Sequence, residues 1–534
     1  MLRTSKQILL VGCCVLVSAA IFCAADEPLA NVELSGLYAS SIDEVLRLPP
    51  EQIDVGIAAL IVSEAWSDMV AGRQYQQQLN DMAMAIRSRL KTTGPTPAAI
   101  PVINSYLFDE LRFRSIDKAS DPYDLFLHSV MDRRQGYCLS LSILYLAIGE
   151  RLGLPLYGVV VPGHFFVRYD DGQRRFNIET TSKGAAASDE YYIRKFNVPK
   201  NNATLYMVNL NKLQSLGCFF NNLGNVYNDV GNVDQAMASL QCAVYINPSL
   251  AESRINLGNI YLKKDRVDDA ITEYQAATKI NPDDPKAHNN LGNAYQKRRW
   301  FNEAVAEYAF CIRLDPNFVD AYRNLAIAYR NLNQPSEAIA ALTQALTLEP
   351  GNAILYQELA DIYNQSDNCD EAVPLYEKAL KLKPGIAEAY FGLAGCYNKL
   401  GQTDKEIDAY KKALAINPNM FAALANLGNA YFAKGKFDAA IEQYNHAVLI
   451  NVGDAKLYYN LGAAYSNKGN FAQAVKPLLK VIEIDPQMAD AHYAIGFAYY
   501  KLKNYDAARK YIKTAEQLGA EIDPNLLKAI EHKN

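Results

Sequence analysis

Residues 285–318 have the sequence PKAHNNLGNAYQKRRWFNEAVAEYAFCIRLDPNF, and this unit decides the fold of the C-terminal half of the chain. Gly292 and Tyr295 share one face of a first helix, because residues three apart are neighbours on a helical surface. Ala304 follows in a second helix, and Pro316 ends the unit because proline cannot donate the hydrogen bond that would continue a helix. The unit is therefore predicted to be a pair of packed helices.

The same pattern repeats with a step of 34 residues, and residues 217–522 hold nine copies of it. A tyrosine marks the first helix of every copy, at Tyr227, Tyr261, Tyr295, Tyr329, Tyr363, Tyr397, Tyr431, Tyr465 and Tyr499. One helix pair cannot bury its own apolar face, so neighbouring copies are expected to stack. The pattern closely resembles tetratricopeptide repeats, which implies an all-α superhelix whose concave groove binds a protein or peptide. Residues 523–534 are expected to form a C-terminal capping helix.

A second pattern runs along the repeats, in which asparagine occupies one or both of two positions three residues apart on the first helix. Its members are Asn222, Asn225, Asn256, Asn259, Asn290, Asn293, Asn324, Asn426, Asn429 and Asn460. An amide side chain offers a donor and an acceptor, so such a row can hold a peptide backbone of any sequence. The row resembles the asparagine ladder of O-linked N-acetylglucosamine transferases. The alternative is that these side chains cap or bridge neighbouring helices, and the sequence leaves both open.

The composition excludes several classes of protein. The chain has 534 residues, of which 50% are hydrophobic and 21% charged, so it is neither disordered nor collagen-like. Its net charge of −5 provides no basic excess, so nucleic acid is not an expected partner. The nine cysteines show no spacing typical of a metal site and no phosphate-binding loop is present, so no metal and no other cofactor is expected. The length exceeds that of one ordinary core, so two or more domains are expected, and residues 29–212, which precede the repeats, are expected to form one of them.

Residues 1–25 are predicted to be a targeting segment. Arg3 and Lys6 supply a positive start, and no charge follows from Gln7 to Ala25. The segment is either a cleaved signal peptide or an uncleaved membrane anchor, and lipid modification of Cys13 is a third interpretation. In each case the rest of the chain is expected to be exported, in the periplasm or anchored in a bacterial envelope, with membrane contact only through an uncleaved segment.

Cys138 is the candidate nucleophile. It comes directly before the apolar run Leu139–Ala147, which is predicted to be a buried helix that ends near Gly153. At the amino end of a helix the macrodipole favours a thiolate and lowers the pKa of a thiol, and free amides there can hold an oxyanion. The alternative is that Cys138 is a small core residue.

Three strands are predicted to follow this helix, and the last two form a hairpin. Asp171-Gly172 between alternating apolar runs is typical of a tight two-residue turn. The predicted strands span residues 156–161, 164–169 and 174–179.

A two-residue turn would pair residues whose numbers sum to 343, which places His164 opposite Glu179 at about 5 Å between Cβ atoms. Glu179 could then orient His164, and Asn177 is the reserve candidate for that role. The same register sets Arg168 opposite Arg175, which predicts a splayed pair at the surface.

The region resembles the transglutaminase-like superfamily at four motifs, namely Gln135-Gly136-Tyr137-Cys138, Leu152-Gly153-Leu154-Pro155, Pro162-Gly163-His164-Phe165 and Phe176-Asn177-Ile178-Glu179. The resemblance covers most of residues 45–210 and is closest to the bacterial SirB-type branch, in which such a core precedes tetratricopeptide repeats. It implies a papain-like core with Cys138 as nucleophile, His164 as base and Glu179 as orienting acid. Many relatives in that branch carry proline at the cysteine position, whereas this chain keeps the cysteine.

These features together predict an α+β papain/transglutaminase-like domain at residues 29–212, followed by an all-α tetratricopeptide-repeat superhelix at residues 217–522. The first functional hypothesis is an exported cysteine-dependent amide-bond enzyme, a peptidase or transglutaminase-like acyl transferase, whose repeats bind a polypeptide substrate or partner. One alternative is a non-enzymatic envelope scaffold with a vestigial core. The other is a regulator whose core binds a peptide without cleaving it.

Overall fold

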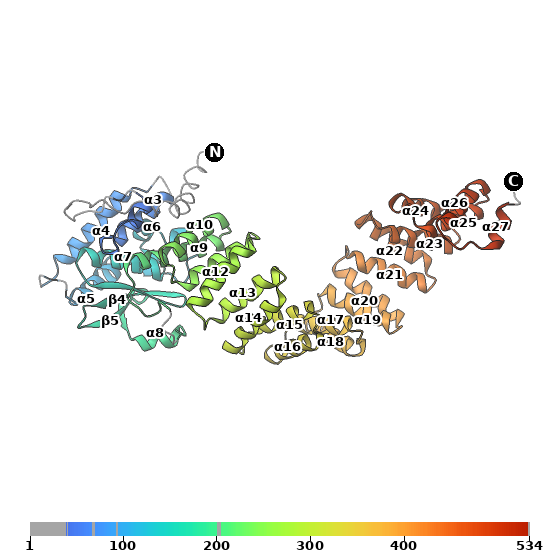
Figure 1. The fold of residues 1–534 in the computed structure, drawn as a ribbon. Coiled ribbons are helices and arrows are strands. Elements are labelled where there is room, and N and C mark those ends of the chain that lie inside the picture. Colours follow the sequence, from blue (N-terminus) through green and yellow to red (C-terminus); the bar gives the residue numbers. More distant parts are fainter. Residues whose placement is uncertain are drawn as a thin grey trace. The chain divides into compact units, whose positions relative to one another are not determined.

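The computed structural model describes residues 39, 41–66, 70–91, 94, 96–199 and 204–531, and the predicted targeting segment at residues 1–25 lies outside them. The chain divides into two compact units, Met1–Phe318 and Val319–Asn534 (Figure 1). Within the described residues, no helix combines the length and the apolar character that a membrane span requires.

Helix α7, Cys138–Arg151, forms the centre of the N-terminal domain. Every side chain from Cys138 to Gly149 is buried, as expected for a helix that is apolar on all sides. Helices α3, Val55–Trp66, and α4, Gly72–Arg87, pack against it, and strand β4, His164–Asp170, also contacts it (Figure 1). The predicted buried helix that begins at Cys138 is therefore confirmed.

Four antiparallel strands form the sheet of this domain, in the order β3-β4-β5-β6. They are β3 Leu156–Val161, β4 His164–Asp170, β5 Arg175–Glu179 and β6 Ala185–Ala187. Helix α8, Asp189–Lys195, lies against the sheet, and its Tyr192 packs on Val159, Val161 and Phe166. The three predicted strands are confirmed, and β6 is an addition to them.

The hairpin of β4 and β5 differs from the predicted register by two residues. Arg168 pairs with Asn177, so paired residue numbers sum to 345 rather than 343. The loop is wider because Asp171 Oδ1 accepts hydrogen bonds from the amides of Gln173 and Arg174, at 2.8 and 2.6 Å. A shift of two residues keeps every side chain on its predicted face, because side chains alternate with a period of two.

Arg168 is wholly buried, so its predicted pairing with Arg175 at the surface is wrong. Its guanidinium donates to Asn177 Oδ1 at 2.7 Å and to Asp189 Oδ1 at 2.8 Å. It also donates to the carbonyl oxygen of Met207 at 2.8 Å. A buried charge must be paired and hydrogen-bonded to be tolerated, and these contacts tie β5, α8 and the segment before the repeats to β4.

Short elements connect these parts. They are α2 Ile42–Leu46, η1 Pro50–Gln52, α5 Ala99–Asn104, the π-helical η2 Ser105–Glu110, β1 Arg114–Ser115, η3 Pro122–Asp124, α6 Leu127–Arg133, β2 Gln135–Gly136 and η4 Thr180–Ser182. Strands β1 and β2 pair in parallel, and because β2 ends just before α7, this pairing fixes the chain as it enters that helix.

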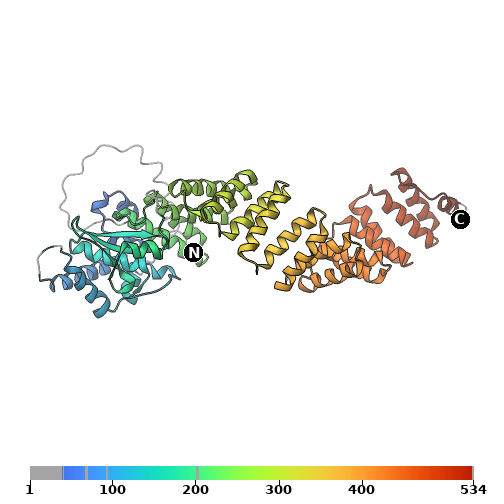
Figure 2. The same ribbon diagram turned by 90° about the horizontal axis from the view of Figure 1, so that it is seen from below.

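In the part of the chain that the structure describes, helices α9 to α26 form nine consecutive pairs. The first unit contains α9 Lys212–Asp229 with α10 Val233–Ile246, α11 Ala251–Lys263 with α12 Val267–Ile280, and α13 Pro285–Lys297 with α14 Phe301–Leu314. Helix α9 contacts both α3 and β3, so the first pair packs directly on the N-terminal domain (Figure 2).

The second unit contains the other six pairs. They are α15 Val319–Asn331 with α16 Pro335–Leu348, α17 Ala353–Gln365 with α18 Cys369–Leu382, α19 Ala387–Lys399 with α20 Thr403–Ile416, α21 Phe421–Ala433 with α22 Phe437–Ile450, α23 Ala455–Asn467 with α24 Phe471–Ile484, and α25 Ala489–Lys501 with α26 Tyr505–Gln517. A last helix, α27 Pro524–Glu531, buries Leu526 and Ile530 against the α26 side of this array. The predicted fold class, an α+β domain followed by all-α helix pairs, is confirmed.

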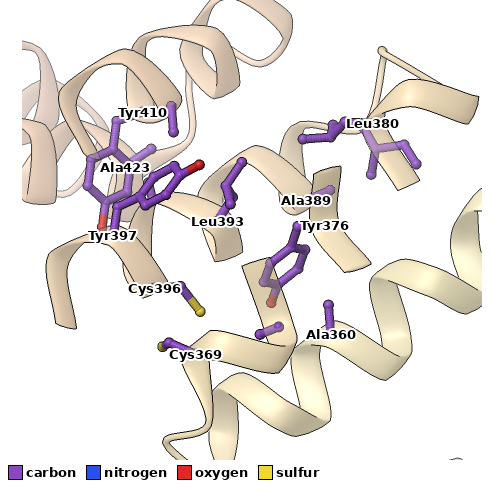
Figure 3. Close-up of a cluster of buried hydrophobic side chains, with 14 of the residues drawn as sticks. Ala360, Cys369, Tyr376, Leu380, Ala389, Leu393, Cys396, Tyr397, Tyr410 and Ala423 are labelled. Carbon is purple, nitrogen blue, oxygen red and sulfur yellow. The ribbon is translucent and has the colours of Figure 1, made fainter. Parts of the chain in front are cut away.

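The glycine of the repeat pattern allows the two helices of a pair to approach closely. A Cβ atom at Gly428 would lie 2.5 Å from the Tyr444 ring, and one at Gly258 would lie 2.5 Å from the Tyr274 ring. The partner aromatic belongs to the second helix in each case. Figure 3 shows the equivalent tyrosine of another pair, Tyr376, in a buried cluster of the second unit, where Ala360 takes the place of the glycine.

Replacing Gly428 by valine forces the Tyr444 ring out of its position. We expect the free energy of unfolding to fall by about 2 kcal/mol, the usual cost of overpacking a close-packed core. Urea unfolding followed by circular dichroism measures this change. Gly385→Val is the control, because no heavy atom lies within 4 Å of a Cβ there, and it should unfold like the wild type. Equal effects of the two substitutions would contradict the close-approach argument.

Candidate catalytic site

Cys138 is the first residue of α7, and its backbone is fixed by the turn before it. The hydroxyl of Ser140 accepts the amide of Tyr137 at 2.8 Å and donates to the carbonyl oxygen of Asp124 at 2.9 Å. Cys138 therefore lies at a fixed helix amino end. Cys138 is only 3% exposed.

His164 is the first residue of β4 and follows the two-residue turn Pro162-Gly163, in which Gly163 has a φ of 71°. Its Nε2 atom lies 2.8 Å from Oε2 of Glu179, and the Cys138 thiol is within hydrogen-bonding reach of the same imidazole. Because Nε2 is used by Glu179, Nδ1 is the ring nitrogen left for the thiol. The structure thus brings the three predicted residues together.

Glu179 reaches His164 along a diagonal rather than from the opposite position. The two-residue shift of the hairpin moves Glu179 along β5 but leaves both side chains on one face. The longer side chain of glutamate spans the added distance. Asn177, the reserve candidate, instead donates to Ala187 O at 3.0 Å and to Asp189 Oδ1 at 2.7 Å, so it does not orient His164.

The charges of this group of residues stabilise one another. Burial disfavours the charged form of His164, but hydrogen bonds and charge interactions with Cys138 and Glu179 outweigh it and raise the pKa of His164 to about 9. Burial likewise opposes the charge on Glu179, but hydrogen bonds from His164 and Thr181 lower its pKa to about 2. At neutral pH the imidazole is therefore expected to be protonated beside a carboxylate, the state that pairs with a thiolate.

Further residues that the sequence did not single out complete the site. Tyr192 donates its hydroxyl to Glu179 Oε2 at 2.9 Å, and Thr181 donates both its hydroxyl and its amide to Oε1, at 2.6 and 3.1 Å. The ring of Phe196 stacks on His164 with centroids 4.7 Å apart. The position of Thr181, two residues after the predicted acid, is a signal that sequence reasoning could have used. The contributions of α8 depend on tertiary packing and carry no such local signal.

A second set of contacts joins the acid strand to the nucleophile helix. The hydroxyl of Thr180 lies 3.0 Å from that of Ser142 in α7 and donates to the carbonyl oxygen of Cys138 at 3.4 Å. The residue that follows Glu179 is therefore bonded directly to Cys138. This contact keeps the end of β5 at the amino end of α7.

The asparagines of the repeats bond mainly to neighbouring helices. Asn259 Oδ1 accepts from the Tyr274 hydroxyl at 2.6 Å and from Asn290 Nδ2 at 3.2 Å. Asn429 Oδ1 accepts in the same way from Tyr444 at 2.8 Å and from Asn460 at 3.1 Å. One amide oxygen thus joins the second helix of its own repeat to the first helix of the next.

Other members of the row follow related patterns. Asn256 donates to Asn221 at 3.0 Å, Asn293 accepts from Tyr308 at 2.7 Å, Asn426 donates to Tyr410 at 3.2 Å, and Asn222 donates to the carbonyl oxygen of Cys218 at 3.0 Å. Asn225 and Asn324 lie half-buried on α9 and α15. The contacts favour the alternative in which these amides bridge helices, and their contact with a partner stays a prediction.

Comparison with known proteins agrees with this architecture. The family model described as the transglutaminase-like superfamily matches residues 73–208, and models of the tetratricopeptide repeat match segments between residues 219 and 518. A "UPF0162 protein" of Xylella fastidiosa is 33% identical over 133 residues, which are 24% of this chain and 45% of that protein. "F-box only protein 21" of Mus musculus is 38% identical over 76 residues, 14% of this chain and 12% of that protein.

The chain thus spans less than half the length of the curated relatives it matches. Among solved structures, MamA covers 30% of this chain and 94% of its own, with 30% identity and a TM-score of 0.29. PilF of Pseudomonas aeruginosa covers 39% and 94%, with 19% identity and a TM-score of 0.35. Residues 73–208 therefore form a transglutaminase-like domain, and tetratricopeptide repeats follow it.

Replacing Glu179 by glutamine removes a negative charge beside the imidazole, so the pKa of His164 should fall from about 9 toward its ordinary value of 6.5. NMR of histidine-labelled protein between about pH 5 and about pH 10 gives the midpoint. The signal is identified by its absence in His164→Ala. Tyr192→Phe keeps the carboxylate and is the control, with a midpoint above that of Glu179→Gln. An unchanged midpoint in Glu179→Gln would show that the carboxylate does not stabilise the imidazolium.

The bond between Tyr444 and Asn429 can be measured with a double-mutant cycle. Asn429→Ala and Tyr444→Phe each remove one partner, so their effects on the free energy of unfolding should fall short of additivity by about 1 kcal/mol. Urea unfolding of the two single variants and the double variant supplies the numbers. Asn429→Ala with Tyr410→Phe is the control pair, because Tyr410 bonds to Asn426 instead. Additive effects in the first pair would favour a free amide available to a ligand.

Proposed function

We propose that the transglutaminase-like domain and the repeats that follow it form a cysteine-dependent amide-bond enzyme. The observation that carries this proposal is the meeting of Cys138, His164 and Glu179. His164 Nε2 lies 2.8 Å from the carboxylate of Glu179, and the Cys138 thiol interacts with the same imidazole. A nucleophile, a base and an orienting acid in this order are the requirement for thiol-based acyl transfer.

The chemistry follows from these positions. The Cys138 thiolate would attack the carbonyl carbon of an amide, and the oxyanion would face the free amides at the start of α7. The His164 imidazolium would give its proton to the departing amine as the carbon–nitrogen bond breaks, which leaves a thioester on Cys138. Water or a second amine would then attack the thioester, His164 would take up the proton of the attacking group, and Cys138 would leave as the thiolate, which restores the starting thiolate–imidazolium pair. The first acceptor gives peptidase activity and the second gives cross-linking.

The repeats would supply the polypeptide. Tetratricopeptide repeats typically mediate protein interaction, and the stacked helix pairs within each unit provide an extended surface for it. We further propose that the domain acts after export, in the periplasm or anchored in a bacterial envelope, as the charge pattern of residues 1–25 predicts.

The scaffold alternative is favoured by one observation. Cys138 is only 3% exposed, and the side chains of His164 and Glu179 are 12% and 8% exposed. A substrate carbonyl has to reach a sulfur that is almost covered. If that approach never opens, the domain is a folded support for the repeats, and Cys138→Ala would change nothing that the protein does.

The deciding experiment traps the nucleophile in the full chain. A peptide carrying a thiol-reactive vinyl sulfone is incubated with the protein at neutral pH, and the adduct is located by mass spectrometry. Cys138 should react selectively, because burial raises the pKa of Cys311 to about 12 and raises the pKa values of Cys218 and Cys396 as well. His164→Ala should slow the labelling by about a hundredfold or more, the usual contribution of a general acid or base.

Two results would count against the enzyme. Equal labelling of Cys138 and the other thiols, or labelling that is insensitive to His164→Ala, would support the scaffold. Binding of the same peptide without any adduct on Cys138 would support a regulator that holds a peptide without cleaving it. A Cys138→Ser variant separates binding from reaction in each case.

A further inference from the structure

A carboxylate from the second repeat reaches the turn that carries His164. Glu252 lies in the first turn of α11 and is half-buried. Its Oε1 atom accepts the hydroxyl of Tyr206 at 3.0 Å, and its carboxylate also faces the backbone amide of Gly163, close enough to interact with it. Both donors belong to the N-terminal domain, and Gly163 directly precedes His164.

The turn at Pro162-Gly163 gains from an acceptor outside the hairpin. Pro162 fixes φ near −65° and Gly163 has a φ of 71°, the combination of a type II turn. Type II turns fit the twist of a two-residue hairpin poorly, so the strands gain little from the turn itself. Water can satisfy the amide of the exposed Gly163 but does not fix its position, whereas an acceptor held by the fold does, and Glu252 is placed to act as that acceptor.

Tyr206 ties the same carboxylate to the sheet. Its backbone forms an isolated bridge with Val160 of β3, and the following amide, of Met207, donates to the Val160 carbonyl at 3.1 Å. Tyr206 thus lies beside the carboxyl end of β3, and its hydroxyl points toward the second repeat.

An acid in the first turn of a helix is favourable by itself, because it complements the helix dipole. The helix dipole explains why an acidic residue is favourable at this position. It does not explain why the carboxylate oxygens of Glu252 contact groups of the N-terminal domain. The carboxylate of Glu252 is committed to groups outside its own helix, on both the turn before His164 and the segment beside β3.

We propose that Glu252 is a positioning residue of the catalytic site, which holds the Pro162-Gly163 turn, and through it His164, against Cys138. The inference rests on the proposed function and extends it. The catalytic domain alone does not complete the site, because the second repeat supplies one of its supports. In such an enzyme the repeats support the catalytic site in addition to binding the polypeptide.

The test compares Glu252→Ala with Glu252→Gln in the full chain. Alanine removes the acceptor, whereas the carbonyl oxygen of glutamine can still accept from Gly163. Glu273→Ala is the matched control, because Glu273 pairs with Arg254 at 2.8 Å in the same repeat and does not touch the turn. Three quantities are measured, namely hydrogen exchange of the peptide that contains Gly163, the NMR midpoint of His164, and the rate of Cys138 alkylation by iodoacetamide.

Glu252→Ala should speed exchange at the turn, move the His164 midpoint from about 9 toward 6.5, and slow alkylation at neutral pH by roughly tenfold, as the loss of one hydrogen bond to a charged group gives. Glu252→Gln and Glu273→Ala should stay within about twofold of the wild type in all three. Restoration by glutamine separates positioning from a general loss of stability.

The outcomes distinguish this inference from the proposed function. Unchanged exchange and an unchanged His164 midpoint in Glu252→Ala would overturn the role of Glu252, even if Cys138 is reactive. A response in exchange and midpoint with an unreactive Cys138 in every variant would support Glu252 and overturn the enzyme. If Glu252→Ala does not fold, Tyr206→Phe removes only the hydroxyl that orients Glu252, and it should give the same changes in smaller measure.

Discussion

The burial of α7 is the constraint on which the candidate site depends. Its side chains from Cys138 to Gly149 are all enclosed, and each buried Leu or Ile contributes roughly 1.5–3 kcal/mol, whereas a hydrogen bond contributes about 1 kcal/mol. Packing rather than hydrogen bonding therefore decides where the amino end of α7 lies. Once α7 is fixed against β4, the first residue of the helix and the first residue of the strand, Cys138 and His164, meet. Hydrogen bonds then refine an arrangement that apolar contacts have already selected.

The sequence predicted which residues form the site but not the strand register that brings them together. The apolar run after Cys138 and the alternation around His164 are local signals, so the helix and strands could be read from them. The hairpin register depends on Asp171, whose carboxylate captures two backbone amides and widens the loop. A rule that assigns a two-residue turn to every Asp-Gly pair does not take these side-chain hydrogen bonds into account. The predicted pairing of His164 with Glu179 is still correct, because a register shift of two residues leaves both side chains on the same face of the sheet. The glutamate side chain is also long enough to reach His164 from the diagonal position.

In the repeats, the sequence pattern predicted the fold but not the role of the asparagine side chains. The period of 34 residues predicted the helix pairs, yet the asparagine row allowed two interpretations because an amide can serve a ligand or a neighbouring helix equally well. The deciding partners are the tyrosines of the second helices. Where Asp361 replaces asparagine, Tyr376 donates to that carboxylate at 2.5 Å, and where Gly395 replaces it, Tyr410 accepts from Asn426 of the next repeat. The tyrosine hydroxyl thus finds a partner in each case, which indicates that satisfying this buried group is the constant requirement.

The shell around His164 explains why a covered site can still hold charge. Phe196 stacks on the ring and Tyr192 caps the carboxylate, so little water competes for either group. Low local polarity strengthens the attraction between the imidazolium and Glu179, and it penalises any separation of the two. A site of this kind gains from rigid supports, because a small displacement of His164 would leave a buried charge without its partner. The contact of Glu252 with the turn before His164 supplies such a support from the repeats. The charged pair of His164 and Glu179 is therefore stable only when the first repeats are docked on the N-terminal domain.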